Sequence, residues 1–244
     1  MRRFFVPPQN IDGDTVVLSG PQSHHLRSVL RLQPGDNIEL LDGTGSVYLT
    51  EILTITNTSI KGRITGRRQE NHTSPFPLTL AQGILKGKRM DLILQKATEL
   101  GVDTLIPLMT RYCQQQKNMD RRIQRWHRVM LEACKQCGRS FPMHITPAVR
   151  LQDLPVESFT YPVFCWEEEA QASIRPELFT APGKVLLLIG PEGGFHEQEV
   201  QWAQDTGFHS VTLGPLVLRS ETAAIAGVGI IQYLTRLQPH QRQE

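Results

Sequence analysis

The sequence has no apolar run near the ~20 residues of a membrane span. Its 4 cysteines include a single Cys-x-x-Cys pair, Cys134 and Cys137, late in a predicted helix, and no second Cys or His pair lies at zinc spacing. A thioredoxin-like thiol would need a helix N-terminus, where the dipole lowers its pKa. The first residues also lack the apolar stretch of a signal peptide. We therefore expect a cytoplasmic protein with no metal centre and no membrane span.

Two nucleotide-binding motifs are also missing. The segment 186–194, L-L-L-I-G-P-E-G-G, lacks the Gly-Lys-Ser/Thr of a P-loop, which argues against an NTPase. Its glycines do not have the G-x-G-x-x-G spacing, and Pro191 stiffens the turn, so a Rossmann oxidoreductase is weakly supported. What the sequence does contain is a second apolar strand running into a glycine turn and a helix, at 213–224. One such turn fits a ligand-free bend equally well, but a pair favours a backbone-lined pocket for a nucleoside-bearing cofactor.

The net charge of +2 conceals an uneven distribution. Residues 73–145 carry twelve Lys and Arg against five Asp and Glu, whereas 146–244 carry six against twelve. In the predicted helix 119–137, an apolar stripe expected to face the core consists of Ile123, Trp126, Met130, Cys134 and Cys137. A basic stripe follows another face at Arg121, Arg125, Arg128, Lys135 and Arg139, and further basic residues flank the helix at Lys86, Lys88, Arg89, Lys96 and Lys117. A solvated face without a partner remains the alternative to an RNA-binding surface.

The pattern of short strands changes near residue 72. Strands are predicted at 15–18, 37–41, 47–56 and 59–65, with one helix near 23–32, which together suggest a small β-barrel. The polar, proline-bearing stretch 67–77 is typical of a linker, and the boundary is expected near 72–76. Beyond it, strands at 78–85, 104–109, 161–166, 185–189 and 209–213 alternate with helices at 89–100, 119–137, 197–206 and 220–237. This alternation predicts an α/β domain with a parallel sheet covered on both faces.

Four spaced motifs carry a family resemblance. They are I-G-P-E-G-G at 189–194, L-G-x-x-x-L-R-x-E-T-A at 213–223, Q-K-A-T-E-L-G-V at 95–102 and E-A-C-K-Q-C-G-R at 132–139. With R-R-F-F at 2–5 and H-H-L-R-S-V-L-R at 24–31, they resemble the RsmE-type 16S ribosomal RNA (uracil-N3) methyltransferases of the SPOUT superfamily. Leu216 departs from the family pattern, in which a basic residue is expected.

The resemblance implies a PUA-like RNA-binding β-barrel domain at 1–72 and a trefoil-knotted SPOUT methyltransferase domain at 73–244. It also implies S-adenosyl-L-methionine as cofactor and ribosomal RNA of the small subunit as partner. Because N3 of uracil carries a proton and is buried in a duplex, the enzyme must act on an unpaired or flipped uridine. Two other functions stay open: a SPOUT ribose 2′-O methyltransferase, and a non-catalytic RNA-binding factor for ribosome assembly.

Site residues follow from the two turns and the basic clusters. The cofactor is expected at Leu188, Gly190, Pro191, Glu192, Gly193, Leu213, Gly214, Leu216, Leu218 and Thr222. RNA phosphates are expected at Arg2, Arg3, His24, Arg27, Arg31, Lys86, Lys88 and Arg89, although each histidine fits local packing or capping better. Proton removal could fall to Glu221 or Glu192, and charge on the uracil oxygens could be stabilised by Arg219 or Arg139. Glu221 fits the role of a first-turn helix acid equally well.

The predicted helix at 220–237 is apolar nearly all round and must be buried on more than one side. Its small residues Ala223, Ala224, Ala226, Gly227 and Gly229 allow close approach of another helix. A central core helix in a monomer is one explanation. The resemblance favours a homodimer in which residues of one chain, Arg139 among them, reach the cofactor of the other.

Overall fold

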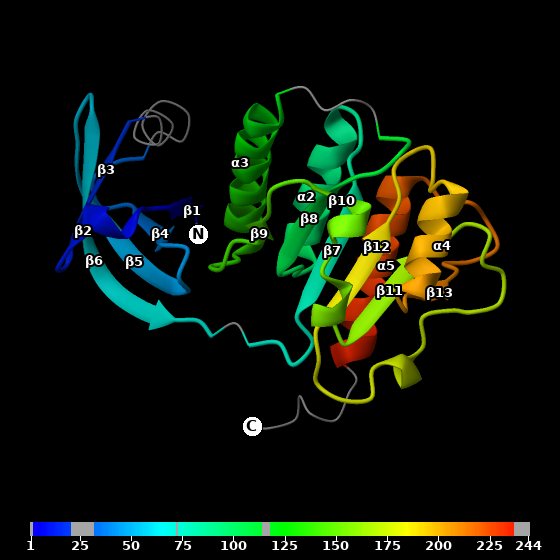
Figure 1. The fold of residues 1–244 in the computed structure, drawn as a ribbon. Helices are drawn as coiled ribbons and strands as arrows, with labels where there is room; N and C mark the ends of the chain where they lie inside the picture. The colour runs from blue at the N-terminus through cyan, green and yellow to red at the C-terminus, as the bar shows by residue number, and fades with distance from the viewer. Residues whose placement is uncertain (1, 21–31, 72, 114–117, 237–244) are drawn as a thin grey trace. The chain divides into compact units, whose positions relative to one another are not determined.

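The computed structural model describes residues 2–20, 32–71, 73–113 and 118–236. The chain forms two compact units: Met1–His72 with Cys134–Pro142, and Thr73–Ala133 with Met143–Glu244 (Figure 1). None of the helices in the described part of the chain has the length and apolarity needed to span a membrane. The helix predicted near 23–32 lies outside the described residues.

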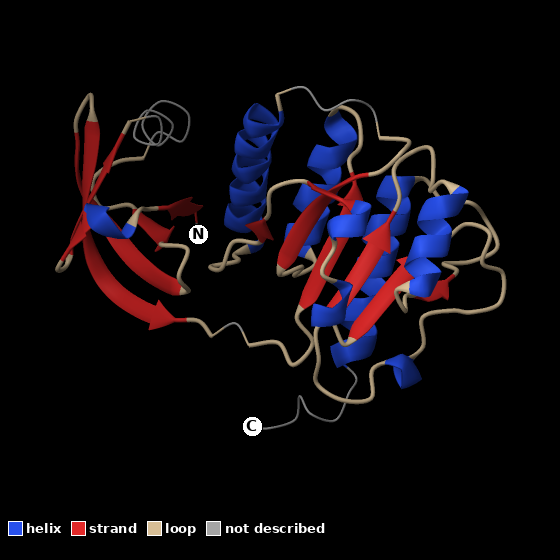
Figure 2. Cartoon of the chain, in the orientation of Figure 1, coloured by secondary structure: helices blue, strands red, loops and turns tan. Residues whose placement is uncertain are grey.

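The first unit is built on a curved, mostly antiparallel sheet (Figure 2). Its strands are β1 (Arg2–Phe5), β2 (Ile11–Asp12), β3 (Thr15–Ser19), β4 (Asn37–Leu41), β5 (Ser46–Ile55) and β6 (Ser59–Gln69), with the 3-10 helix η1 (Pro8–Asn10) between β1 and β2. The strand order is β1-β4-β5-β6-β3-β2, and β1 pairs with β4 in parallel. Alternate residues of the strands, such as Val16 and Leu18, point into one hydrophobic core with Phe4, Ile38 and Ile60.

The predicted linker begins later than the sequence suggested. Residues 67–69 belong to β6, because they pair with residues 46–48 of β5. Arg67 Nη2 lies 2.7 Å from Asp14 Oδ1, and Arg68 Nη1 lies 2.7 Å from Glu39 Oε1. Polar composition at this point therefore marks a sheet surface with ion pairs, and the linker prediction was wrong for these three residues.

Residues 134–142 join the first unit although they are distant from it in sequence. Ser140 Oγ donates a hydrogen bond of 2.5 Å to Glu70 Oε2. The ring of Phe141 fills the space beside Gly45, where an added Cβ would lie 2.1 Å from the ring. The first unit thus includes the last residues of the helix 119–137 and the segment that follows it.

The second unit contains a parallel sheet with the order β10-β8-β7-β12-β11-β13, and β9 pairs with β8. The strands are β7 (Leu78–Gly83), β8 (Thr104–Met109), β9 (His144–Ile145), β10 (Val149–Arg150), β11 (Tyr161–Cys165), β12 (Val185–Ile189) and β13 (His209–Val211). The helices are α2 (Lys88–Glu99), α3 (Met119–Cys137), α4 (Glu197–Asp205) and α5 (Ser220–Arg236), with 3-10 helices η3 (Leu151–Asp153), η4 (Val156–Ser158) and η5 (Pro176–Leu178).

Helices cover both faces of this sheet, as its apolar strands predicted. In β12, Leu186 and Leu188 pack with Val200 and Ala203 of α4. Leu187 points the other way, toward α5, where a Cβ on Gly227 would lie 3.1 Å from it. A central parallel strand buried on both faces is apolar at every position, because neither set of side chains meets water. The prediction of an α/β domain with a parallel sheet is confirmed.

The apolar stripe of α3 is confirmed for Trp126, Met130 and Cys134, which are all buried. Cys137 is exposed, so its place in the stripe was wrong. It is the last residue of the helix, and the chain leaves the helical path at Gly138, which has φ 84°. The apolar stripe therefore ends before the last residue of the helix.

Candidate functional site

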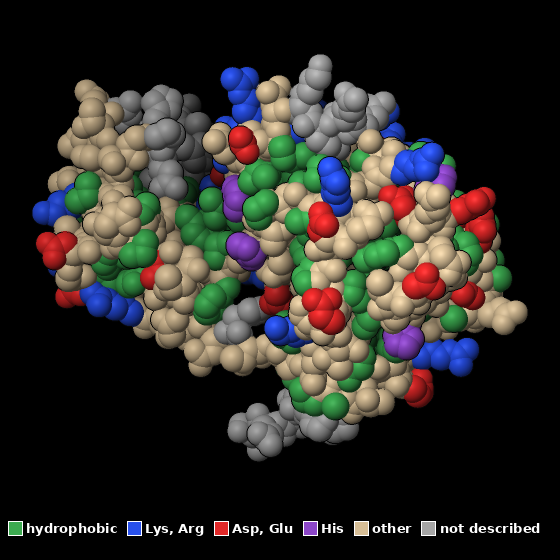
Figure 3. Space-filling view, viewed as in Figure 1, with side chains coloured by type: hydrophobic (Ala, Val, Ile, Leu, Met, Phe, Trp, Pro, Cys, Tyr) green, Lys and Arg blue, Asp and Glu red, His purple; other side chains and the backbone are tan. Residues whose placement is uncertain are grey.

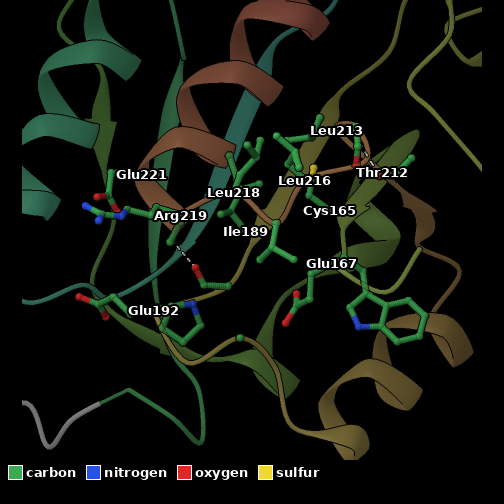
Figure 4. A pocket seen from close by; sticks show the side chains of 18 of the residues that line it. Cys165, Glu167, Ile189, Glu192, Thr212, Leu213, Leu216, Leu218, Arg219 and Glu221 are labelled. Carbon is green, nitrogen blue, oxygen red and sulfur yellow. Dashed lines mark hydrogen bonds between the residues drawn. The ribbon is translucent and has the colours of Figure 1, made fainter. Parts of the chain in front are cut away.

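A cavity of about 310 Å³ lies at the carboxyl ends of β11, β12 and β13 (Figure 4). These three strands are neighbours in the sheet, in the order β12-β11-β13. Because they are parallel, the loops that follow them meet at one edge, which is where open α/β sheets bind their ligands. The volume falls within the range of small-molecule sites.

The cavity brings together most of the residues expected at the two turns. Those that line it are Gly190, Pro191, Glu192, Leu213, Gly214, Leu216, Leu218, Arg219 and Glu221. In Figure 4 the side chains of Leu213, Leu216 and Leu218 gather on one side, with Glu167 opposite and Arg219 and Glu221 at one end. The two turns, some twenty residues apart in the sequence, thus line the same cavity.

The remaining predicted residues lie elsewhere. Leu188 is fully buried and packs in the core, because alternate residues of β12 face α4. Gly193 and Thr222 do not line the cavity, although the residues on either side of each of them do. Gly193 contacts Tyr112 instead, since an added Cβ would lie 3.0 Å from the Cβ of Tyr112. Arg139 belongs to the first unit, where its Nε donates a 2.6 Å hydrogen bond to the carbonyl oxygen of Phe141.

Sequence reasoning missed the segment after β11. Cys165, Trp166 and Glu167 line the cavity beside the two predicted turns, as do Ile189 and Thr212. The signal that could have found them is their position: they end a buried strand, and polar residues at such ends meet at the ligand-binding edge of a parallel sheet. Without the strand order, the neighbours of β12 could not be named.

The second turn depends on Gly214. Its φ of 133° lies in the region that favours glycine, and an added Cβ would meet nothing within 4 Å. The hydroxyl of Thr212 stabilises this turn, because it accepts from Gly214 N at 3.2 Å and donates to Gly214 O at 2.9 Å. The backbone here is strained for any other residue and open toward the cavity.

Gln82, at the end of β7, connects both turns. Its side-chain Nε2 lies 3.2 Å from the carbonyl oxygen of Gly190 and 3.0 Å from Ser220 Oγ. Ser220 Oγ also donates to the carbonyl oxygen of Gly190. Ser220 begins α5, so one buried polar network fixes the first turn against the helix that follows the second.

Three carboxylates border the cavity, and their environments differ. Glu192 Oε1 accepts from Lys86 N and from Arg89 Nη1, both at 3.0 Å. Burial alone would raise the pKa of Glu192, but hydrogen bonds from the backbone and from Arg89 lower it below its ordinary value. Within the described residues, the side chains of Glu167, Glu221 and Arg219 have no ion pair and no hydrogen bond.

Cys165 lines the cavity with a neutral thiol. Burial raises its pKa to about 12, so the thiolate does not form at physiological pH. Its sulfur lies near α5, where a Cβ on Gly227 would be 3.8 Å away. Cys165 therefore contributes an apolar wall rather than a nucleophile.

The residues expected to bind RNA are spread over both units. In the first, Arg2 is exposed and Arg3 Nε lies 2.8 Å from Glu39 Oε2. His24, Arg27 and Arg31 lie outside the described residues. In the second, Lys86, Lys88 and Arg89 are exposed around the start of α2, and Arg89 lines the cavity.

The basic face of α3 is partly engaged by the protein itself. Arg125 pairs with Asp91 of α2. The guanidinium of Arg122 lies 5.2 Å from the ring centre of Trp126. Arg121 and Arg128 are exposed, whereas acidic side chains gather over the region of α4 in Figure 3. The charge asymmetry of the sequence is thus visible on the surface of the second unit.

Comparisons with known proteins place this geometry in a family. A family model for an RNA methyltransferase domain matches residues 72–232, and a model for an RNA methyltransferase PUA domain matches residues 18–65. The ribosomal RNA small subunit methyltransferase E of Buchnera aphidicola subsp. Schizaphis graminum is 32% identical over 226 residues, which cover 89% of each chain. That of Aquifex aeolicus is 31% identical over 222 residues, covering 90% of this chain and 94% of the relative.

Two solved structures have the same fold over almost the whole chain. The ribosomal RNA small subunit methyltransferase E from Neisseria gonorrhoeae, bound to S-adenosyl methionine, is 33% identical with a TM-score of 0.84, covering 96% of this chain and 98% of that one. A putative methyltransferase from Legionella pneumophila, in complex with bound SAM, is 31% identical with a TM-score of 0.86, covering 95% and 96%. The chain therefore belongs to the ribosomal RNA small subunit methyltransferase E family, with a PUA domain followed by an RNA methyltransferase domain.

Proposed function

We propose that this protein transfers the methyl group of S-adenosyl-L-methionine to N3 of a uridine in 16S ribosomal RNA. The observation that carries the proposal is the cavity of about 310 Å³ between two glycine turns at the carboxyl edge of the parallel sheet. Family relatives with the same fold hold this cofactor. A ribosomal substrate implies that the protein works in the cytoplasm.

The lining of the cavity fits the cofactor. Leu213 and Leu218 supply apolar walls for the adenine, and the backbone around Gly190 and Gly214 supplies hydrogen-bonding groups. Glu167 offers a carboxylate without an ion pair among the described side chains, suited to the ribose hydroxyls. When bound, the cofactor supplies an activated methyl group on its sulfonium sulfur.

The acceptor atom needs a base, because the lone pair of N3 becomes available only when its proton leaves. Glu221 is the better candidate than Glu192, because hydrogen bonds from Lys86 and Arg89 lower the pKa of Glu192 and weaken it as a base. We assign to Glu221 the role of the base that accepts the proton from N3. Arg219, whose guanidinium has no ion pair in the described structure, would stabilise the negative charge that develops on the uracil oxygens.

We also propose that the protein works as a homodimer. The exposed side of α5 carries Ile230 and Tyr233, of which Tyr233 is 66% exposed. The segment before α5 carries Leu216 and Val217, which are 76% and 79% exposed. Such a set of large apolar side chains is costly to leave in water, and a second copy of the chain would cover it.

The function is tested with small ribosomal subunits from cells that lack this gene. Incubation with the purified protein and S-adenosyl-L-methionine should produce 3-methyluridine, detected by mass spectrometry of digested RNA. Appearance of a ribose 2′-O-methylated nucleoside instead would support the alternative methyltransferase. RNA binding without any methylated product would support the assembly factor.

A matched pair of variants tests the base. Glu221→Gln should lower the turnover number by about 100-fold at unchanged cofactor affinity, since general bases contribute about that much or more. Glu167→Gln should instead weaken cofactor binding. Equal turnover in Glu221→Gln and wild type would exclude Glu221 as the proton acceptor.

A further inference from the structure

A second groove, of about 320 Å³, lies at the same edge of the sheet as the cofactor cavity. It is lined by the ends of β8 and β10 and by the beginning of α4, through Met109, Arg150 and His196 among others. The described strands of this sheet pair in parallel, so their carboxyl ends share one edge. The groove therefore lies on the side of the domain where the substrate must approach.

The groove presents two guanidinium groups. Arg111 and Arg150 are exposed, and neither side chain has an ion pair or hydrogen bond within the described residues. The carboxylate in the lining, Glu199, is only 5% exposed and is already bound. Its oxygens accept from Arg111 N at 2.8 Å and from His196 N at 2.9 Å. Glu199 thus connects the backbone at Arg111 to the start of α4 at His196, and the two guanidinium groups remain available for an anion.

An exposed aromatic ring separates this groove from the cofactor turn. Tyr112 follows Arg111 directly and is 50% exposed. Its ring lies 6.0 Å from that of His196, at an interplanar angle of 62°. A Cβ on Gly193 would lie 3.0 Å from the Cβ of Tyr112, so Tyr112 is in contact with the I-G-P-E-G-G turn as well.

His196 fixes the groove from the side of α4. Its Nδ1 accepts from Gln198 N at 3.2 Å, which makes His196 the N-cap of this helix. With its ring against Tyr112 and its backbone N–H bound by Glu199, His196 supports the aromatic ring, and Glu199 holds the backbone of Arg111 as well. A ring supported in this way loses little conformational entropy when a base stacks on it.

Cationic side chains beside an exposed ring are the chemistry of single-stranded RNA binding, in which arginines contact phosphates and aromatic rings stack on bases. We propose that Arg111, Tyr112 and Arg150 form a flanking-nucleotide subsite, which binds the RNA next to the methylated uridine. Tyr112 stacks on a neighbouring base, and the two arginines hold the adjacent phosphates. The subsite rests on the proposed function, because it requires an RNA substrate whose target base is unpaired.

The stacking is tested with Tyr112→Ala and the conservative Tyr112→Phe. Loss of one stacked base should weaken RNA binding by about ten-fold in Tyr112→Ala, whereas Tyr112→Phe should bind as wild type does. Cofactor affinity, measured by calorimetry, should stay unchanged in both, which separates RNA binding from damage to the nearby turn. Equal RNA affinity in Tyr112→Ala and wild type would overturn the stacking.

The phosphate contacts are tested by salt dependence. Removing both charges in Arg111→Ala/Arg150→Ala should reduce the slope of log affinity against log salt by about 1.4, since each phosphate contact to a single strand contributes about 0.7. Lys184→Ala is the control, because Lys184 is exposed just before β12, at the opposite edge of the sheet. An unchanged slope in the double variant would refute the phosphate contacts.

The two hypotheses fail in different ways. If the proposed function is wrong, the wild-type protein itself produces no 3-methyluridine on small subunits. If only the subsite is wrong, the wild-type protein methylates RNA and the Tyr112 and arginine variants match it in RNA affinity and in KM for RNA.

Discussion

The side-chain amide of Gln82 connects parts of the cavity that are far apart in the sequence. It donates to Gly190 O and to Ser220 Oγ, and no donor reaches its own Oε1 within the described structure. A buried donor that serves two acceptors is costly to remove, because Ser220 Oγ loses its donor and Gly190 O keeps only the hydrogen bond from Ser220. Gln82 is therefore a positioning residue. It does not line the cavity, but it holds the turn at Gly190 against the start of α5 at Ser220.

Gln82→Leu should weaken binding of S-adenosyl-L-methionine by about ten-fold, which corresponds to the loss of about one buried hydrogen bond. Calorimetry of the full chain measures this, and thermal unfolding reports the loss of stability separately. Gln201→Leu is a matched control, since that exposed residue of α4 bonds only locally, to Asp205. A lower melting temperature with unchanged cofactor affinity would mean that Gln82 supports the fold alone.

The turn between β13 and α5 requires a backbone conformation at Gly214 that favours glycine. Gly214→Val should weaken cofactor binding by at least about ten-fold, because its positive φ is strained for any residue with a Cβ. Gly207→Val is the control: it has a positive φ and open surroundings as well, but lies at the end of α4, away from this cavity. Cofactor affinity equal to wild type in Gly214→Val would place the cofactor elsewhere.

Gly190 is a less selective probe than Gly214. A Cβ at Gly190 would lie 2.8 Å from the ring of Phe195, which packs against Phe164 in the core. We therefore expect Gly190→Val to lower both cofactor affinity and the melting temperature. The expected loss of stability differs between the two glycines because their surroundings differ, which the sequence alone does not show.

In the N-terminal sheet, Glu39 of β4 joins β1 and β6 through Arg3 and Arg68. The hydrogen bond from Arg68 lowers the pKa of Glu39 below its ordinary value of 4.5; burial opposes this, and Arg3 adds to it. A carboxylate with a lowered folded-state pKa stabilises the fold above its unfolded pKa, and this contribution is lost as the pH falls through the folded value.

Glu39→Gln should therefore destabilise the sheet by about 1–2 kcal/mol at pH 7, as expected for a hydrogen-bonded charge that loses its partners. The difference from wild type should shrink as the pH falls below 4.5. Hydrogen exchange of the β4 amides, compared between variant and wild type at equal pH, measures it. A difference that persists unchanged at low pH would assign the effect to packing.

On the scale of the whole molecule, α5 has two different sides. Ala224, Val228 and Ile231 are buried against the sheet and α2, whereas Ile230 and Tyr233 face outward. Between them a Cβ on Gly229 would meet nothing within 4 Å, so a second helix could approach closely there. Within the described residues, this helix leaves large apolar side chains exposed on one side, which the proposed homodimer would cover.

A homodimer with shared sites should allow complementation. Mixing an Arg139→Ala chain with a cofactor-deficient Gly214→Val chain should restore activity, because one site of each heterodimer then has an intact cofactor pocket and an intact Arg139. Light scattering gives the oligomeric state, and the methylation assay gives the rescue. A monomeric mass at micromolar concentration would contradict the dimer, and a dimer without rescue would contradict the shared site.

The sequence by itself determined the helices of the second unit, its strands β7, β8, β11, β12 and β13, and the two turns that line the cavity. The two-residue strands β9 and β10 were not predicted. Uniform burial makes β12 apolar throughout, and a turn that needs a positive φ requires glycine, as at Gly214. Such signals are local, because neighbouring residues alone determine the backbone conformation of a turn and the hydrophobic period of a helix or strand. Helices α2 to α5 accordingly lie within a residue or two of their predicted bounds.

Only the tertiary structure decided which residues meet. It brought Cys165 and Glu167 to the cavity by placing β11 between β12 and β13, and it joined Gln82 to Ser220 across 138 positions. It also placed residues 134–142 with the N-terminal sheet, and Arg3 against Glu39. The physical reason is that strand order and ion pairing depend on contacts between distant segments, whose energies leave no periodic pattern in the sequence.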